Sequence, residues 1–312
     1  MNELELSTVE IDGEQYEMWD STKLKAYACQ ERGRLGHEEH LIPVEPAEAL
    51  AFGAMLHKGV EEWTKLGGDD KAVALAEARA LAVWEKELPL ETREMLELGG
   101  NRRSYGNFKR LFAGFRKKFP LSMYDKIIEV EKPFALPLGT TRRGVKVAWC
   151  GKRDRVLGWQ GGIYYTDIKT STFALDEGFF DKFKRSGQML GYAWSGRQQL
   201  GLDFTGILIQ AVQVQAPLKT KVRMPEELCQ ADTIRISGSQ IDEWVESTLS
   251  KIDRIHQARE EGYYDRDNGD LCQNYNRECN FAKLCNAEPE ARAALKARLF
   301  RKRVWNPLEE ET

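Results

Sequence analysis

Two aspartates and a lysine are the residues of this chain whose types and spacing could do chemistry. Asp154 ends a short charged run, and Asp167 is followed two positions later by Lys169. Strand-forming residues flank a glycine-rich stretch at 158–162, which predicts a β-hairpin with its turn between the two aspartates. Because Asp154 and Asp167 stand equally far from that turn, their Cβ atoms should face each other roughly 5 Å apart. Lys169 shares a strand face with Asp167.

Like charges this close on a half-buried sheet are costly unless a cation joins them. Carboxylate oxygens suit Mg²⁺ or Mn²⁺, and a lysine beside such an ion can hold or deprotonate a water, or offset charge on a phosphate. The pattern therefore predicts a site for phosphodiester hydrolysis. The alternative is a cross-strand salt bridge on a solvated face. Asp-x-Lys alone is a weak signal, and it recurs at Asp69-Asp70-Lys71, where it indicates a turn and a helix cap.

Two further pairs of residues, each four positions apart, lie in helical patterns. Gly53 and His57 share one face of a predicted helix, where a histidine can ligate a metal or can simply sit at the edge of the core. Gln188 and Tyr192 share a face of an amphipathic helix predicted over about 177–200. This face would contact nucleic acid or the attacking water, or it would belong to an ordinary helix with a half-buried tyrosine.

The six cysteines are unevenly distributed, with three of them close together near the C-terminus. No signal peptide or transmembrane run is evident, so we expect a cytoplasmic protein without disulfides. A cytosolic cysteine cluster more often binds metal, and three thiolates need a fourth ligand, for which Cys29 is the natural candidate. Cys150 is interpreted as a core residue and Cys229 as incidental. The three clustered residues are Cys272, Cys279 and Cys285.

Periodicity predicts the elements that must position these residues. The strands are expected at about 124–135, 145–157, 162–169 and 204–214, and the helices at about 177–200 and 238–260, with a helical insert over about 70–120. This order predicts an α/β fold in which helices flank a mixed central sheet. We expect one domain over residues 1–290, closed by the cysteine-bearing segment, and a C-terminal tail over 291–312.

Charge composition limits the partners. The chain has 46 Lys and Arg against 49 Asp and Glu, a net charge of −3, so it is not a general polyanion binder. Residues 101–120 nevertheless carry seven basic side chains, no acidic ones and interleaved aromatic residues. This stretch is either an amphipathic helix with a solvated basic face or a surface that follows phosphates. No phosphate-binding loop of the P-loop type occurs, so the chain has no motor of its own.

The order of these motifs resembles the RecB-type branch of the PD-(D/E)XK nuclease superfamily. It is similar, more narrowly, to the iron–sulfur members: AddB-type nuclease domains, CRISPR-associated four-cysteine exonucleases and their phage relatives. The motifs span roughly residues 20–285. They are an early cysteine after a serine-led helix, Gly-x3-His, Gly-x2-Asp, Asp-x-Lys, Gln-x3-Tyr and three final cysteines.

The resemblance implies a restriction-endonuclease-like core and a role for each motif residue. Lys169 would be the catalytic lysine, with Gln188 and Tyr192 supporting DNA or the site. Cys29 and the three clustered cysteines would hold a [4Fe–4S] cluster that pins the C-terminus to the N-terminal segment. Zinc is the alternative, because the first gap between the clustered cysteines is six residues rather than the usual two. The implied metal ligands are His57, Asp154, Asp167 and the Ile168 carbonyl.

We therefore expect a Mg²⁺- or Mn²⁺-dependent DNA exonuclease in the cytoplasm of a prokaryotic or phage-infected cell. It would act on single-stranded DNA or DNA ends in recombination, repair, phage replication or spacer processing, alongside a helicase, recombination or CRISPR partner and without a membrane. One alternative is a non-catalytic module that binds DNA ends on a nuclease fold. Another is a metal-stabilised structural protein whose acidic hairpin is accidental. Every catalytic position holds a competent residue, which argues against the non-catalytic module.

Overall fold

The computed structural model describes residues 7–45, 47–217, 223–267, 269–274 and 277–308. Contacts divide the chain into two compact units, each assembled from separate stretches. The first comprises Met1–Glu45, Pro133–Lys152 and Gly238–Thr312, and the second comprises Pro46–Lys132 and Arg153–Ser237. The expectation of one domain over residues 1–290 with a tail over 291–312 stays a prediction.

A mixed sheet forms the centre of the second unit. Its strands are β5 (Lys146–Trp159, from Arg153 onward), β6 (Gly162–Ser171), β7 (Phe204–Gln213) and β8 (Cys229–Ile234). β5 pairs antiparallel with β6, β6 parallel with β7, and β7 antiparallel with β8. The predicted mixed α/β fold class is thereby confirmed. β8 was not predicted, and Cys229, interpreted as incidental, begins that strand as a buried core residue.

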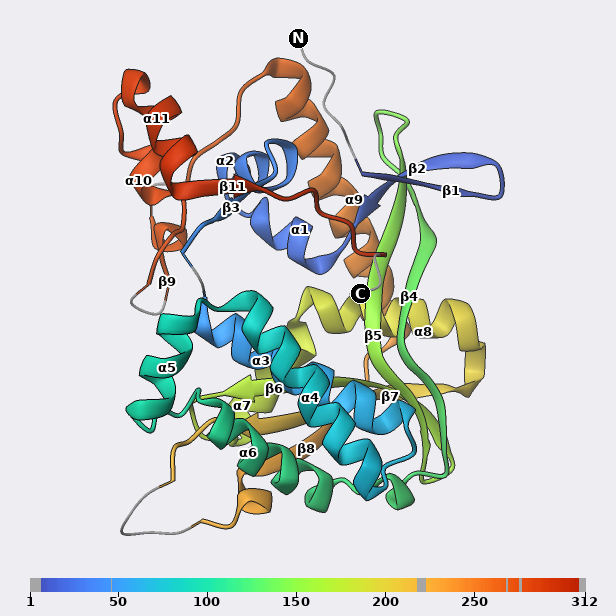
Figure 1. The fold of residues 1–312 in the computed structure, drawn as a ribbon. Coiled ribbons are helices and arrows are strands. Elements are labelled where there is room, and N and C mark those ends of the chain that lie inside the picture. Colours follow the sequence, from blue (N-terminus) through green and yellow to red (C-terminus); the bar gives the residue numbers. More distant parts are fainter. Residues whose placement is uncertain (1–6, 46, 218–222, 268, 275–276, 309–312) are drawn as a thin grey trace. The chain divides into compact units, whose positions relative to one another are not determined.

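Four helices make one layer over this sheet (Figure 1): α3 (Glu48–Lys65), α4 (Asp70–Glu87), α5 (Leu90–Leu98) and α6 (Tyr105–Lys118). Two of them begin at side-chain caps, because Asp69 accepts from Ala72 N at 2.7 Å and Ser104 from Asn107 N at 3.1 Å. Their apolar faces share one core with Ile168 and other residues of the sheet. Burial of each large side chain in this core contributes about 1.5–3 kcal/mol.

The opposite face of the sheet is covered by α7 (Glu177–Asp181), a 3₁₀ turn (Lys182–Arg185) and α8 (Gly187–Leu200). The Tyr165 ring on β6 contacts the rings of Tyr192 on α8 and Phe204 on β7, at centroid distances of 6.5 and 5.0 Å. The single helix predicted over 177–200 is wrong, because the chain is extended at Ser186 (ψ 129°). Serine and glycine are weak helix formers, and the sequence pair Ser186-Gly187 marks this break.

The first unit is built from both ends of the chain. β1 (Thr8–Ile11) pairs with β2 (Glu14–Trp19), and β2 pairs parallel with the first part of β5. β3 (Leu41–Pro43) pairs antiparallel with β11 (Phe300–Lys302), so the two terminal segments are joined directly by backbone hydrogen bonds. The strand β4 (Lys126–Thr140) begins in the second unit and ends in the first. The helices here are α1 (Ser21–Ala26), α2 (Gln30–Gly33), α9 (Gly238–Glu261), α10 (Ala282–Cys285) and α11 (Pro289–Leu299).

A buried charged network holds the first unit together. Glu17 on β2 accepts from Lys23 Nζ at 3.1 Å and from Arg259 Nη1 at 3.0 Å, and it lies 2.6 Å from His256 Nε2. Arg259 Nε also donates to Glu38 at 2.7 Å. The Glu17 and Lys23 side chains are each only 3% exposed, so every charge here depends on its partners. In the described part of the chain, no helix is long and apolar enough to cross a membrane.

Candidate active site

The β5–β6 hairpin brings the two aspartates together. Trp159 pairs with Gly162, so the turn consists of Gln160 and Gly161, which both have positive φ (50° and 76°), as expected for a tight hairpin turn. Away from the turn, the backbone pairing of β5 with β6 ends at Arg155 opposite Thr166. The same register, continued by one residue, places Asp154 opposite Asp167. There Asp154 Oδ2 accepts a hydrogen bond from Ile168 N at 2.6 Å. A side chain thus continues the ladder where backbone pairing stops.

The helix α8 holds the Asp-x-Lys motif. Lys169 Nζ lies 2.8 Å from Asp167 Oδ2 and donates to Gln188 Oε1 at 2.8 Å. Gln188 Nε2 donates to Asp167 Oδ1 at 3.0 Å and to the Tyr192 hydroxyl at 3.3 Å. Gln188 therefore fixes the positions of the lysine and the carboxylate at once, and Tyr192 fixes Gln188.

Three side chains that could ligate a metal ion converge beside this motif. His57 Nδ1, on α3, lies 3.3 Å from Asp154 Oδ2. Ligand atoms of His57, Asp154 and Glu131 all lie within 4.8 Å of one another. Glu131 comes from β4, which pairs with β5, and it has a left-handed backbone (φ 52°) inside a strand. Such a conformation is costly for a non-glycine residue and often marks a functional position.

The sequence did not reveal Glu131. It alternates with Glu129 in a charged strand, and neither belongs to a recognisable motif. Its proximity to Asp154 depends on the register between β4 and β5, which local sequence does not determine. The other predicted residues are brought together: His57 with Asp154, and Asp167 with Lys169, Gln188 and Tyr192. Ile168 touches the site through its N–H, whereas a role for its carbonyl stays a prediction.

The charges of the site are interdependent. Burial raises the pKa of Asp167, and the nearby charge of Asp154 raises it further. Burial alone would raise the pKa of Asp154 too, but the charge and hydrogen bond of His57 outweigh burial and lower it. Burial lowers the pKa of His57, yet Asp154 outweighs that effect and raises it to about 9. At neutral pH His57 is therefore protonated, and its positive charge offsets that of Asp154. A metal ion that binds His57 must displace this proton.

A family model for the PD-(D/E)XK nuclease superfamily matches residues 22–286, which is most of the chain. The chain belongs to this superfamily. The membership supports a nuclease activity and implies DNA as substrate, and PD-(D/E)XK nucleases use divalent metal ions. Membership of the RecB-type branch stays a prediction.

Two solved structures are similar to this PD-(D/E)XK nuclease. A proposed exonuclease from Eubacterium rectale has 13% sequence identity and a TM-score of 0.47, and the match covers 86% of this chain and 93% of that one. The protein SSO0001 also has 13% identity, with a TM-score of 0.31 and 78% of each chain covered. A comparison with curated proteins finds no match. At these TM-scores the structural likenesses carry no further argument.

The donor set fits the divalent ion that such nucleases use. One imidazole nitrogen and two carboxylate oxygens, from His57, Glu131 and Asp154, already stand close enough to share an ion. The His57 side chain is 32% exposed, so solvent reaches the edge of this mostly buried group. Asp167, expected as a ligand, is instead engaged by Lys169 and Gln188. It lies opposite Asp154 in the same register, and its role as a metal ligand stays a prediction.

The four predicted cluster cysteines all lie in the first unit. Burial raises the pKa of Cys272, and the charges of Cys279 and Cys29 raise it further. Burial likewise raises the pKa of Cys285, which also senses Cys279 and Cys29. Cys29 and Cys279 thus lie close enough to both Cys272 and Cys285 to affect the pKa values of these two thiols. Among the described residues, no three cysteines have sulfur atoms that all lie within 4.8 Å of one another. Sulfur atoms that share a tetrahedral zinc ion are roughly 3.8 Å apart.

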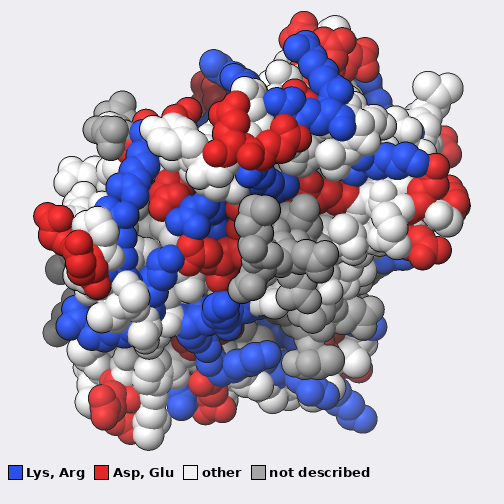
Figure 2. Space-filling view, turned by 90° about the horizontal axis from the view of Figure 1, so that it is seen from above, with Lys and Arg blue, Asp and Glu red and all other residues white. Residues whose placement is uncertain are grey.

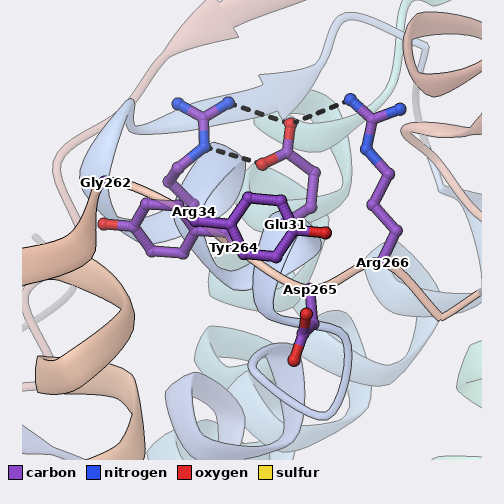
Figure 3. Close-up of a pocket in the computed structure, with 7 residues that line it drawn as sticks. Glu31, Arg34, Gly262, Tyr264, Asp265 and Arg266 are labelled. Carbon is purple, nitrogen blue, oxygen red and sulfur yellow. Dashed lines mark hydrogen bonds and ion pairs between the residues drawn. The ribbon is translucent and has the colours of Figure 1, made fainter.

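A pocket in the first unit contains none of these candidate catalytic residues. It measures about 960 Å³ and is lined by residues of α2 and the adjoining π-helical turn and by the segment after α9. Figure 3 shows how Glu31 engages both Arg34 and Arg266. Two acidic and two basic side chains thus line this pocket.

Basic and acidic side chains are mixed on the face of the molecule that Figure 2 draws. On the face shown in Figure 2, Lys and Arg side chains stand among Asp and Glu, in keeping with the near-zero net charge. Residues 105–118 form the basic amphipathic helix that the sequence predicted, but Lys117 pairs with Glu226 and Arg110 donates to Gln215 O. Two of the basic groups of this helix are thus already engaged within the protein.

Proposed function

We propose that this nuclease is a Mg²⁺- or Mn²⁺-dependent DNA exonuclease that hydrolyses phosphodiester bonds in single-stranded DNA or at DNA ends. The observation that supports it is the convergence of His57, Glu131 and Asp154 beside the Lys169–Asp167 pair. Recombination, repair, phage replication and spacer processing all supply such ends. A helicase, recombination or CRISPR protein would serve as partner.

The side chains have separate tasks in this proposal. His57, Asp154 and Glu131, joined by Asp167 and the Ile168 carbonyl, would hold the metal. A bound divalent ion supplies an acidified water and neutralises phosphate charge. Lys169 positions a cation next to the reacting phosphate, where it offsets the charge that develops or exchanges a proton with the water. Gln188 keeps that amine in place, and Tyr192 keeps Gln188 in place.

Removal and return of the metal test this proposal. End-labelled single-stranded DNA should remain intact in excess EDTA and be degraded when Mn²⁺ or Mg²⁺ is supplied. An exonuclease releases short products from the end and leaves a circular single strand intact. DNA that is bound but never cut with any divalent ion would contradict the proposal and favour the non-catalytic module instead.

Glu131→Gln is expected to weaken Mn²⁺ binding by roughly 10- to 100-fold, because it removes one anionic donor from the converging group while keeping its shape. Isothermal titration of Mn²⁺ into the metal-free protein measures this directly. Glu62→Gln on α3 is the matched control, since Glu62 pairs with Lys58 at 3.0 Å and contacts no candidate ligand. Equal affinities for the two variants would show that Glu131 is not a ligand.

We also infer that Cys29, Cys272, Cys279 and Cys285 hold a [4Fe–4S] cluster. The influence of Cys29 and Cys279 on the pKa values of Cys272 and Cys285 supports one shared site for the four thiolates, and zinc is the alternative occupant. The pairing of β3 with β11 and the Glu17 network also connect the two ends of the chain. The cluster therefore adds to an existing link between the termini and is not the sole one.

Cys279→Ala should lose the brown colour and most of the iron, because three thiolates hold such a cluster poorly. Visible absorbance and iron content of freshly purified protein measure the loss. Cys229→Ala is the matched control, since Cys229 is buried in the second unit and outside the four cysteines. A colourless wild-type protein containing zinc would overturn the assignment, as would normal iron in Cys279→Ala.

A further inference from the structure

The segment between β6 and α8 borders the active site at both of its ends. It begins after Ser171, two residues beyond Lys169, and it ends at Ser186, two residues before Gln188. Because Gln188 donates to Asp167 and accepts from Lys169, the segment leaves the site and returns to it. Both ends of residues 172–186 therefore lie next to the candidate catalytic residues.

Aromatic side chains pack against one another within this segment. The Phe179 ring contacts Phe180 and Phe183 edge-on, with centroids 5.1 and 5.3 Å apart. Phe179 and Phe180 are buried, whereas Phe183 is only partly covered. Phe173, in contrast, is 72% exposed, and its N–H donates to Ser171 Oγ at 3.0 Å. The backbone thus holds an exposed aromatic ring just beyond the catalytic strand.

Cations continue this aromatic surface away from Lys169. Lys169 Nζ lies 5.9 Å from the Phe183 ring centroid, and Lys182 Nζ lies 4.9 Å from the same ring and 3.9 Å from that of Phe179. Lys182 and Arg185 are both exposed. Lys184 is paired with Asp181 at 2.5 Å, so it is less available to a ligand. An amine, a ring and a second amine therefore follow one another outward from the site.

We propose that residues 172–186 bind the unpaired DNA strand that flanks the scissile phosphate, with Phe173 stacked on a base and Lys182 and Arg185 on phosphates. The proposal rests on the proposed function. Exposed rings beside cations are the means by which proteins bind single strands, because each unpaired base offers a free face for stacking. In a duplex those faces are already stacked, so Phe173 would favour single-stranded over double-stranded DNA.

Fluorescence anisotropy with a labelled oligothymidylate and with a short duplex tests the proposal in EDTA, where no cleavage occurs. Phe173→Ala should weaken single-strand binding about tenfold and leave duplex binding unchanged, and Phe173→Trp should preserve it. Leu202→Ala is the matched control, because Leu202 is fully exposed on the same unit. In the double variant K182A/R185A, the slope of log affinity for the single strand against log salt concentration should become shallower by roughly 0.7 for each phosphate contact that is lost.

Single-strand affinity of Phe173→Ala within twofold of wild type would overturn the proposal, and so would an equal loss for duplex. Cleavage of bis(p-nitrophenyl) phosphate with Mn²⁺, a substrate too small to reach Phe173, separates this result from the function itself. If Phe173→Ala keeps that cleavage but loses single-strand affinity, both proposals are supported. If wild type binds single strands through Phe173 yet hydrolyses neither substrate, the binding surface stands and the nuclease proposal fails.

Discussion

Replacing Lys169 with alanine is expected to lower DNA cleavage by roughly 10²- to 10⁴-fold. The ammonium group lies 2.8 Å from both an Asp167 oxygen and Gln188 Oε1, beside the converging ligands. Alanine removes the charge that would offset the phosphate but keeps the backbone of β6. Asp167 then loses its ion pair, and because burial already raises its pKa, its carboxyl can take up a proton rather than force the strand apart.

Initial rates on end-labelled single-stranded DNA with Mn²⁺ measure this loss, and Mn²⁺ titration shows that the metal site is still formed. Lys71→Ala is the matched control. It belongs to the second Asp-x-Lys pattern, Asp69-Asp70-Lys71, in which Asp69 caps α4 and Lys71 is exposed. Cleavage by Lys169→Ala at the rate of Lys71→Ala would remove Lys169 from the mechanism.

The contrast between these two patterns shows what local sequence can establish. Gln160 and Gly161 favour one turn type, and that turn sets the register that places Asp154 opposite Asp167. At Asp69 the preceding glycines and the following helical pattern indicate a cap, which the hydrogen bond to Ala72 N confirms. In both cases neighbouring residues determine the geometry, so the sequence sufficed.

Other features depend on contacts that are distant in sequence. Glu131 reaches the site only because β4 pairs with β5 and its backbone takes a left-handed turn within the strand. Periodicity carries no information on either point. The break at Ser186 was missed for a different reason. The apolar positions from 177 to 200 keep a helical spacing across it, and this spacing concealed the two weak helix formers Ser186 and Gly187.

The charged network of the first unit likewise depends on contacts between residues that are distant in sequence. Glu17, Lys23 and Arg259 carry no motif, and in sequence each is an ordinary surface residue. In the structure they come from β2, α1 and α9 and share one buried cluster. Such residues can be identified only when the fold is known, yet they should dominate stability, because a buried charge without its partner is costly.

Glu17→Gln is accordingly expected to lower the free energy of unfolding by about 3–5 kcal/mol. Glutamine keeps the size of the side chain but leaves Lys23 and Arg259 buried without their shared counter-ion. Burial by itself raises the pKa of Glu17, but His256, Lys23 and Arg259 outweigh it and hold that pKa well below its ordinary value of 4.5. The ionised carboxylate therefore contributes stability above about pH 4.5, and this contribution is lost as the pH falls further.

Urea denaturation followed by circular dichroism, at pH 7 and at successively lower pH below 4.5, measures both effects. The difference between wild type and Glu17→Gln should be largest at neutral pH and should shrink as acid protonates Glu17. Glu14→Gln is the matched control on the same strand, because Glu14 pairs with Lys146 at the exposed surface and its loss should leave the midpoint near that of wild type. Equal midpoints for the two variants at pH 7 would show that the buried ion cluster does not stabilise the first unit.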